Sequence, residues 1–128
     1  MKKATTILVI DDDADIREMM KIVLEADGYQ VNVAADGVEA LEQLKGGSRP
    51  ALIILDLMMP GLDGEQFVKQ VRTGVFADVP IVVLSGHSAA ERKADELNAI
   101  CLMKPVEVDE LLKTVERLVL PSRRAPAA

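Results

Sequence analysis

Cysteine, aromatic residues and long apolar runs are all scarce in this sequence, and each scarcity excludes a class of protein. Cys101 is the only cysteine, so neither an intrachain disulfide nor a multi-cysteine zinc site can form. A chain without disulfides suits a reducing compartment, and we expect a cytoplasmic protein. The longest apolar runs, such as residues 51–55 and 81–84, fall far short of the roughly 18 residues of a membrane span. We therefore expect no membrane insertion.

Positive charge is also in deficit. The sequence has 15 Lys and Arg against 21 Asp and Glu, a net charge of −6, which repels the phosphate backbone of a nucleic acid. The aromatic residues Tyr29, Phe67 and Phe76 are too few and too scattered to form a base-stacking platform. We expect partners that are proteins or small ions, with no direct binding to nucleic acid.

The length of 128 residues is that of one ordinary domain. The apolar fraction of 49% suffices for a buried core, and the charged fraction of 28% suffices for a hydrated surface. We predict one domain over residues 1–120. Residues 121–128, PSRRAPAA, have little to bury, so we predict a flexible tail or the remnant of a linker there. The N-terminal MKKATTILVI leads into three aspartates without a small-residue cleavage site, which argues against a secretory signal.

Apolar, β-branched runs alternate with helical periodicity along the chain. The run Thr6–Ile10 ends abruptly at Asp11, and the apolar positions of residues 14–27 then follow the three-four spacing of a helix that Gly28 ends. The predicted strands are residues 6–10, 30–34, 51–55, 80–84 and 101–103. The predicted helices are residues 14–27 and 38–45, a segment around 67–71, a weakly amphipathic one within 89–97, and a last one around 111–119. This alternation predicts a parallel sheet with helices on both faces.

Polar side chains follow four of the predicted strands. Ligands of open α/β sheets bind at the carboxyl ends of the strands, so these side chains are the candidates for a functional site. They are Asp11 and Asp12 after the first strand, Asp56 after the third, Ser85 after the fourth and Lys104 after the fifth. We expect these acids, the hydroxyl and the ammonium to converge at one edge of the sheet.

The acids cannot lie together without compensation, because two carboxylates about 5 Å apart repel by roughly 3 kcal/mol at an effective dielectric near 20. Oxygen ligands without His or Cys favour a hard cation, and Mg²⁺ typically takes a few carboxylates with waters and phosphate oxygens. The sequence therefore predicts a Mg²⁺ site. With the ion bound, a carboxylate is a reasonable nucleophile toward a phosphoryl group. Lys104 and Ser85 would help to hold the phosphoryl oxygens.

Four segments, ILVIDDD, LIILDLMMPGLDG, VPIVVLSG and LMKP, occur in this order and together resemble the receiver domains of two-component response regulators over about residues 5–120. The resemblance implies a doubly wound, flavodoxin-like fold with a parallel sheet in the order 2-1-3-4-5; the periodicity alone does not give that order. It also implies a function. A sensor histidine kinase or a phosphotransfer protein donates a phosphoryl group, and the modified domain switches a surface that binds a downstream protein.

The resemblance assigns a role to each candidate residue. Asp56 is the phosphoacceptor, and Ser85 and Lys104 contact the phosphoryl group. Mg²⁺ is assigned to Asp12, Asp56 and the backbone carbonyl of Met58, with Asp11 contributing through water. Gly86 matches a small residue that leaves room for the phosphoryl group, Met58 and His87 match positions that tune its lifetime, and Pro105 is expected to follow a cis peptide bond. We give His87 no catalytic role.

Two departures from the family pattern fall in the part that transmits the signal. Cys101 stands where family members usually carry a tyrosine or phenylalanine that reports phosphorylation, so the usual readout is in doubt, and we expect Cys101 to be a buried, small apolar residue. The interval between Ser85 and Lys104 is a few residues short for the family. The resemblance also leaves room for a homodimer that forms on phosphorylation.

Each residue alone has an ordinary explanation, such as a helix N-terminus for the acids of residues 11–13 or a turn for Asp56. Two other functions compete with the joint pattern. An aspartyl-phosphate phosphatase of the haloacid dehalogenase type would use Asp11 as its nucleophile, but Asp15 stands where that motif prefers Thr or Val. A flavodoxin would need a phosphate-binding loop where this chain has aspartates. We also considered a degenerate receiver that only docks to a partner, which the intact acid set opposes.

We predict a switch with at most self-phosphorylation and autodephosphorylation activity, either free-standing or part of a longer regulator or kinase.

Overall fold

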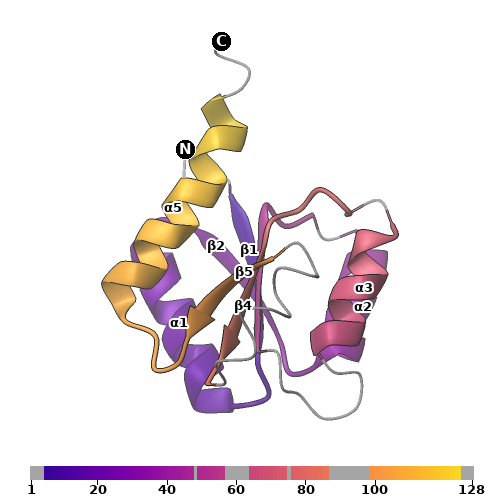
Figure 1. The fold of residues 1–128 in the computed structure, drawn as a ribbon, viewed down its shortest axis with the longest axis horizontal. Helices are drawn as coiled ribbons and strands as arrows, with labels where there is room; N and C mark the ends of the chain where they lie inside the picture. The colour runs from indigo at the N-terminus through magenta and orange to yellow at the C-terminus, as the bar shows by residue number, and fades with distance from the viewer. Residues whose placement is uncertain (1–4, 48, 57–63, 75, 87–98, 125–128) are drawn as a thin grey trace.

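A parallel sheet of five strands forms the centre of the structure (Figure 1). The computed structural model describes residues 5–47, 49–56, 64–74, 76–86 and 99–124. The strands are β1 (Thr6–Ile10), β2 (Gln30–Ala34), β3 (Leu52–Asp56), β4 (Ile81–Ser85) and β5 (Ile100–Met103), and the helices are α1 (Ala14–Ala26), α2 (Gly37–Lys45), α3 (Gly64–Arg72) and α5 (Val108–Arg124). Every neighbouring pair in the order β2-β1-β3-β4-β5 is parallel. The predicted fold class and strand order are confirmed.

Helices cover both faces of the sheet and create two apolar cores. Figure 1 shows α1 and α5 on one face and α2 and α3 on the other. Side chains of a strand alternate between the faces, so Ile7 and Val9 of β1 join the core under α1 and α5, whereas Leu8 and Ile10 join the core under α2 and α3. The two strands β3 and β4 are buried along their whole length. Polar groups on these strands can therefore gather only at the strand ends.

Local sequence signals fix α1, the helix that follows β1. It begins after the N-cap residue Asp13, whose side chain accepts hydrogen bonds from two backbone N–H groups of the first turn. Met20 and Leu24 are the buried residues of its inner face. It ends before Gly28, which has a φ of 100°, a conformation that glycine adopts at little cost. The start of α1 is thus held firmly beside the end of β1.

The C-terminal boundary differs from the prediction. The helix α5 continues to Arg124, whereas the sequence predicts a tail from residue 121 onward. That prediction weighed only how much apolar surface the segment could bury. Residue 121 is a proline, whose φ suits a helix although it lacks the N–H that would donate a helical hydrogen bond. Adding residues to an established helix is also far easier than starting one. Residues 125–128 and the predicted helix within 89–97 lie outside the described residues.

Candidate functional site

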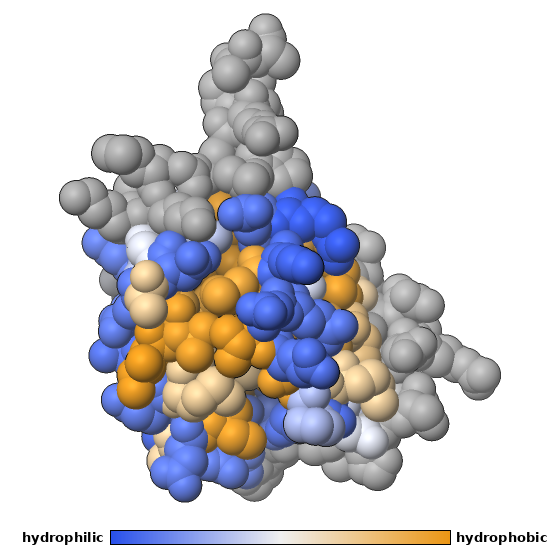
Figure 2. Space-filling view, turned by 90° about the vertical axis from the view of Figure 1, so that its left-hand side faces the viewer, coloured by the Kyte–Doolittle hydropathy of each residue, from blue (hydrophilic) through white to orange (hydrophobic). Residues whose placement is uncertain are grey.

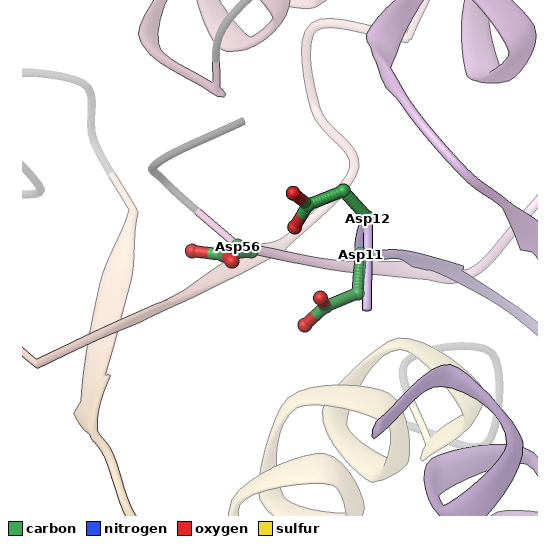
Figure 3. Close-up of side chains that lie close together, drawn as sticks. All are labelled: Asp11, Asp12 and Asp56. Carbon is green, nitrogen blue, oxygen red and sulfur yellow. The ribbon is translucent and has the colours of Figure 1, made fainter. Parts of the chain in front are cut away.

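Three carboxylates lie close together at the carboxyl end of the sheet (Figure 3). The neighbouring parallel strands β1 and β3 place Ile10 opposite Leu55, so the next residues of each chain segment, Asp11 and Asp56, emerge side by side. Oxygens of Asp11, Asp12 and Asp56 all lie within 4.8 Å of one another. Asp11 and Asp56 are buried, whereas Asp12 is exposed. The register of the sheet therefore assembles the cluster that the sequence predicts.

The loop between β1 and α1 is held by its own side chains. The N–H of Asp13 donates to Asp11 Oδ1 at 2.9 Å. Asp13 in turn caps α1, since its Oδ1 accepts from the N–H groups of Asp15 at 2.9 Å and Ile16 at 3.2 Å. Arg17 reaches back from α1, and its Nη1 donates to the backbone carbonyl of Asp11 at 2.8 Å. These bonds tie the two acids of the loop to the helix cap.

The second carboxylate oxygen of Asp11 is in an unfavourable position. Among the described residues, Asp11 Oδ2 is the buried side-chain atom that lacks a hydrogen-bond partner. Burial raises the pKa of Asp11 above its usual value of 3.8, the bond from the Asp13 N–H opposes this shift, and the charge of Asp56 adds to it. An unpaired, buried carboxylate oxygen is costly, and a divalent cation would offset that cost. A set of hard oxygen ligands fits Mg²⁺.

The ammonium of Lys104 faces the acids from the end of β5. Its Nζ lies 3.2 Å from Asp56 Oδ2, and the side chains of Lys104 and Asp56 are 29% and 10% exposed. A partly buried pair of this kind is less screened by salt than a pair on the surface. The Lys104–Pro105 peptide bond is cis, as the resemblance implied. Asp56 thus has a cation on one side and two acids on the other.

Ser85 completes the polar edge. It is the last residue of β4, is buried and stands opposite Met103 of β5. The N–H of Lys104 donates to the Ser85 carbonyl at 2.9 Å, so these two residues are neighbours. The strands β3 and β4 each begin and end one residue later than predicted, which makes Asp56 and Ser85 part of the sheet. A Cβ atom added at Gly86 would meet nothing within 4 Å, which agrees with open space beside Ser85.

Several residues that the sequence singled out have other outcomes. Met58 and His87 lie outside the described residues. Cys101 packs against the core under α2 and α3, as expected of a small apolar residue, but it is only partly buried rather than buried. Sequence reasoning missed Arg17. The available signal was an arginine one turn into the helix that follows the acids, but a bond to a main-chain carbonyl leaves no recognisable pattern of residue types.

An apolar groove adjoins the site on the side of α1. Its volume is about 410 Å³, and its lining includes Met19 and Met20 of α1, Pro105, Val106 and the side chain of Lys104. Figure 2 shows apolar surface, in orange, between polar residues on this face of the molecule. Met19 is 40% exposed and is one of the large apolar side chains that remain open to solvent. No helix in the described ranges is long and apolar enough to pass through a bilayer.

Comparison with known proteins agrees with this architecture. The family model of the response regulator receiver domain matches residues 7–116. The response regulator MprA of Mycobacterium tuberculosis is 38% identical over 125 residues, a match that covers 95% of this chain and 54% of MprA. The chain therefore spans about half the length of the curated relatives it matches.

Solved structures of similar fold come from several bacteria. The chemotaxis protein CheY4 of Vibrio cholerae has a TM-score of 0.82 and 35% identity, with 89% of this chain and 98% of that chain covered. The signal receiver domain of a signal transduction histidine kinase from Syntrophus aciditrophicus has a TM-score of 0.86 and 28% identity, with 94% of each chain covered.

The doubly wound sheet with an acid cluster at its carboxyl edge agrees with the architecture of receiver domains, the switch modules of two-component signalling. This chain belongs to the response regulator receiver domain family. It is therefore grouped neither with the haloacid dehalogenase phosphatases nor with the flavodoxins.

Proposed function

We propose that Asp56 accepts a phosphoryl group in a Mg²⁺-dependent reaction and that this modification switches a protein-binding surface. The observation that carries the proposal is the setting of the Asp56 carboxylate. It lies 3.2 Å from the Lys104 ammonium and within 4.8 Å of oxygens of Asp11 and Asp12. A cation and a site for a second cation thus flank one nearly buried carboxylate, which is what phosphoryl transfer requires of its surroundings.

The transfer itself is a displacement at phosphorus. An Asp56 carboxylate oxygen forms a bond to phosphorus while the bond between phosphorus and the donor atom breaks. The donor keeps the electron pair of the broken bond, and a histidine donor takes up one proton from solvent to become a neutral imidazole. The Lys104 ammonium would pair with a phosphoryl oxygen, and the Ser85 hydroxyl would donate to another.

Asp11, Asp12, Asp56 and the backbone carbonyl of Met58 are the proposed ligands of Mg²⁺, with Asp11 acting through water. The unpartnered Oδ2 of Asp11 supports this assignment. Bound Mg²⁺ would supply positive charge that offsets the repulsion between the acids and the incoming phosphoryl oxygens. The assignment of the Met58 backbone carbonyl as a Mg²⁺ ligand comes from the family resemblance.

The proposed phosphodonor is a sensor histidine kinase or a phosphotransfer protein, and the proposed target is a downstream protein. The apolar groove beside Lys104 supports a protein donor, because it offers a surface next to the reacting carboxylate. A homodimer linked to phosphorylation remains a further proposal. The single cysteine of the sequence, Cys101, is compatible with the reducing environment of the cytoplasm, which is the proposed location.

Phosphorylation of the intact chain by acetyl phosphate tests the proposal. With Mg²⁺ we expect a gain in mass of one phosphoryl group that maps to Asp56, and with EDTA we expect no gain. Asp56→Asn should abolish the gain. Asp15→Asn is the matched control, because Asp15 is an exposed acid in the first turn of α1, and it should be labelled like the parent. Labelling of Asp56→Asn, or labelling at another residue, would overturn the proposal, and decay of the label with time would report autodephosphorylation.

A further inference from the structure

The orientation of Asp12 needs an explanation. Its side chain is exposed, so packing does not hold it, yet one of its oxygens lies within 4.8 Å of oxygens of Asp11 and Asp56. In Figure 3 the side chains of Asp11 and Asp12 extend from the end of β1 toward the side on which Asp56 lies. Because like charges repel, an unrestrained Asp12 would turn toward solvent. A main chain that points the Asp12 Cα–Cβ bond toward the other acids accounts for this position, because it places the carboxylate near them before the side chain rotates.

Both peptide planes that flank Asp12 are held by hydrogen bonds. The plane before it carries the carbonyl of Asp11, which accepts from Arg17 Nη1 at 2.8 Å. The plane after it carries the N–H of Asp13, which donates to Asp11 Oδ1 at 2.9 Å. The two backbone dihedral angles of Asp12 relate these two planes. Fixing both planes therefore fixes the direction of the Asp12 Cα–Cβ bond.

Arg17 anchors its peptide plane to a well-supported element. It is the fourth residue of α1, a helix that Asp13 caps and that buries Met20 and Leu24. The contact of Arg17 with the loop is the hydrogen bond from its Nη1 to the main-chain carbonyl of Asp11. We propose that Arg17 is a positioning residue for divalent-cation binding, which it promotes by holding Asp12 toward Asp11 and Asp56. This inference rests on the proposed Mg²⁺-dependent function.

If Arg17 acts only as a nearby charge, replacing it with an apolar residue should strengthen Mg²⁺ binding. If Arg17 holds the peptide plane, the same replacement should weaken Mg²⁺ binding. Removing a positive charge near a cation site favours cation binding. Releasing the peptide plane disfavours it, because the loop must then be ordered when the ion binds. The direction of the change in Mg²⁺ affinity therefore distinguishes a positioning residue from a nearby charge.

Calorimetric titration of the whole chain with MgCl₂ at constant ionic strength measures this change. We expect Arg17→Met to bind Mg²⁺ about tenfold more weakly than the parent, as the loss of one ordered peptide plane implies. Arg17→Lys retains a donor and should recover most of the affinity. Lys21→Met is the matched control: it removes a cation of the same helix that pairs with Glu25 at 3.6 Å, and it should not weaken binding.

The outcomes separate this inference from the proposed function. Binding by Arg17→Met that equals or exceeds that of the parent overturns the role of Arg17 and leaves the proposed function intact. A parent that binds no Mg²⁺ overturns both. Thermal melts in EDTA check that the variants fold. Should Arg17→Met fail to fold, Arg17→Gln, whose side chain is shorter than that of arginine, replaces it, and the same loss of affinity is expected.

Discussion

At the scale of single residues, Asp11 shows a conflict between stability and binding. It is 1% exposed, and one of its oxygens has no hydrogen-bond partner. Burial raises the pKa of this carboxyl, and the charge of Asp56 raises it further. The folded chain therefore holds the proton of Asp11 more tightly than the unfolded chain does. Ionisation of Asp11 without a cation lowers the stability of the fold.

We expect Asp11→Asn to raise the free energy of unfolding of the metal-free chain by about 1 kcal/mol, or the Tm by about 4 °C. The amide keeps an acceptor for the Asp13 N–H and replaces the unpaired oxygen with a donor. Since the pKa of Asp11 is raised from 3.8, the parent should lose stability relative to the variant as the pH rises through that raised pKa. Thermal melts in EDTA between about pH 4 and about pH 8 measure the difference. A variant less stable than the parent at neutral pH would contradict this expectation.

The residues of the candidate site that lie at the carboxyl ends of strands could be predicted from the sequence. Asp11, Asp12, Asp56 and Lys104 each follow or end a strand of the sheet, and the carboxyl ends of parallel strands meet at one edge. A helix N-terminus at the acids of residues 11–13 is an expected feature of the sequence, and Asp13 is the N-cap of α1. The role of Arg17 could not be predicted in the same way, because it depends on the rotamer of the side chain and on which carbonyl it reaches.

At the scale of elements, Arg72 stabilises the connection between α3 and β4. Its Nη1 donates to the backbone carbonyls of Ala77 at 2.7 Å and Val79 at 2.8 Å. Burial lowers the pKa of Arg72, and the charge of Asp78 opposes the shift. These bonds satisfy two main-chain acceptors just before the strand that ends at Ser85.

We expect Arg72→Met to lower the free energy of unfolding by about 2 kcal/mol, because two partly buried carbonyls lose a charged donor. Lys69→Met on the same helix is the control. Its ion pair with Glu65 spans 3.8 Å between side chains that are 65% and 31% exposed, so we expect a loss below about 0.5 kcal/mol. Urea unfolding of both variants measures the two losses. Equal losses would show that the carbonyl bonds of Arg72 do not stabilise the connection.

The positions of the elements were predictable because periodicity records burial. The strands differ from their predicted bounds by one residue at most, since each contains a short run of apolar or β-branched residues between polar or turn-forming ones. The end of α5 was not predictable in this way, because the residues after Leu120 continue the helix without an apolar face to announce it. The helix within residues 89–97 remains a prediction.

At the scale of the whole molecule, the proposed Mg²⁺ site would link metal binding to folding. Mg²⁺ that binds only the folded chain should stabilise it by about 1.4 kcal/mol at ten times its Kd. We expect the Tm to rise with Mg²⁺ in the parent and to stay constant in Asp12→Ala, because Asp12 is exposed and its loss removes a ligand without disturbing the core. Asp15→Ala should behave like the parent. Differential scanning calorimetry at constant ionic strength measures the shifts, and a parent whose Tm ignores Mg²⁺ would argue against the metal site.

The order of the strands could not be read from periodicity at all. Hydrophobic spacing reveals which segments are strands, but pairing depends on contacts between residues far apart in the sequence. The order β2-β1-β3-β4-β5 was expected only because four segments of the sequence resemble receiver domains. The assignment of residues 1–120 to one domain remains a prediction, and the family match over residues 7–116 lies within that range. Residues 121–124 of the predicted tail belong to α5.

The backbone bond from the Lys104 N–H to the Ser85 carbonyl joins the ends of β4 and β5, and the candidate site therefore has two sides. The ammonium and the hydroxyl belong to one side, because the last residues of β4 and β5 are fastened to each other there. The carboxylates of β1 and β3 form the opposite side. Because this bond couples the two strand ends, Ser85 and Lys104 should move together if the site widens. A substitution that loosens the end of β5 would therefore displace both the hydroxyl and the ammonium from a bound anion.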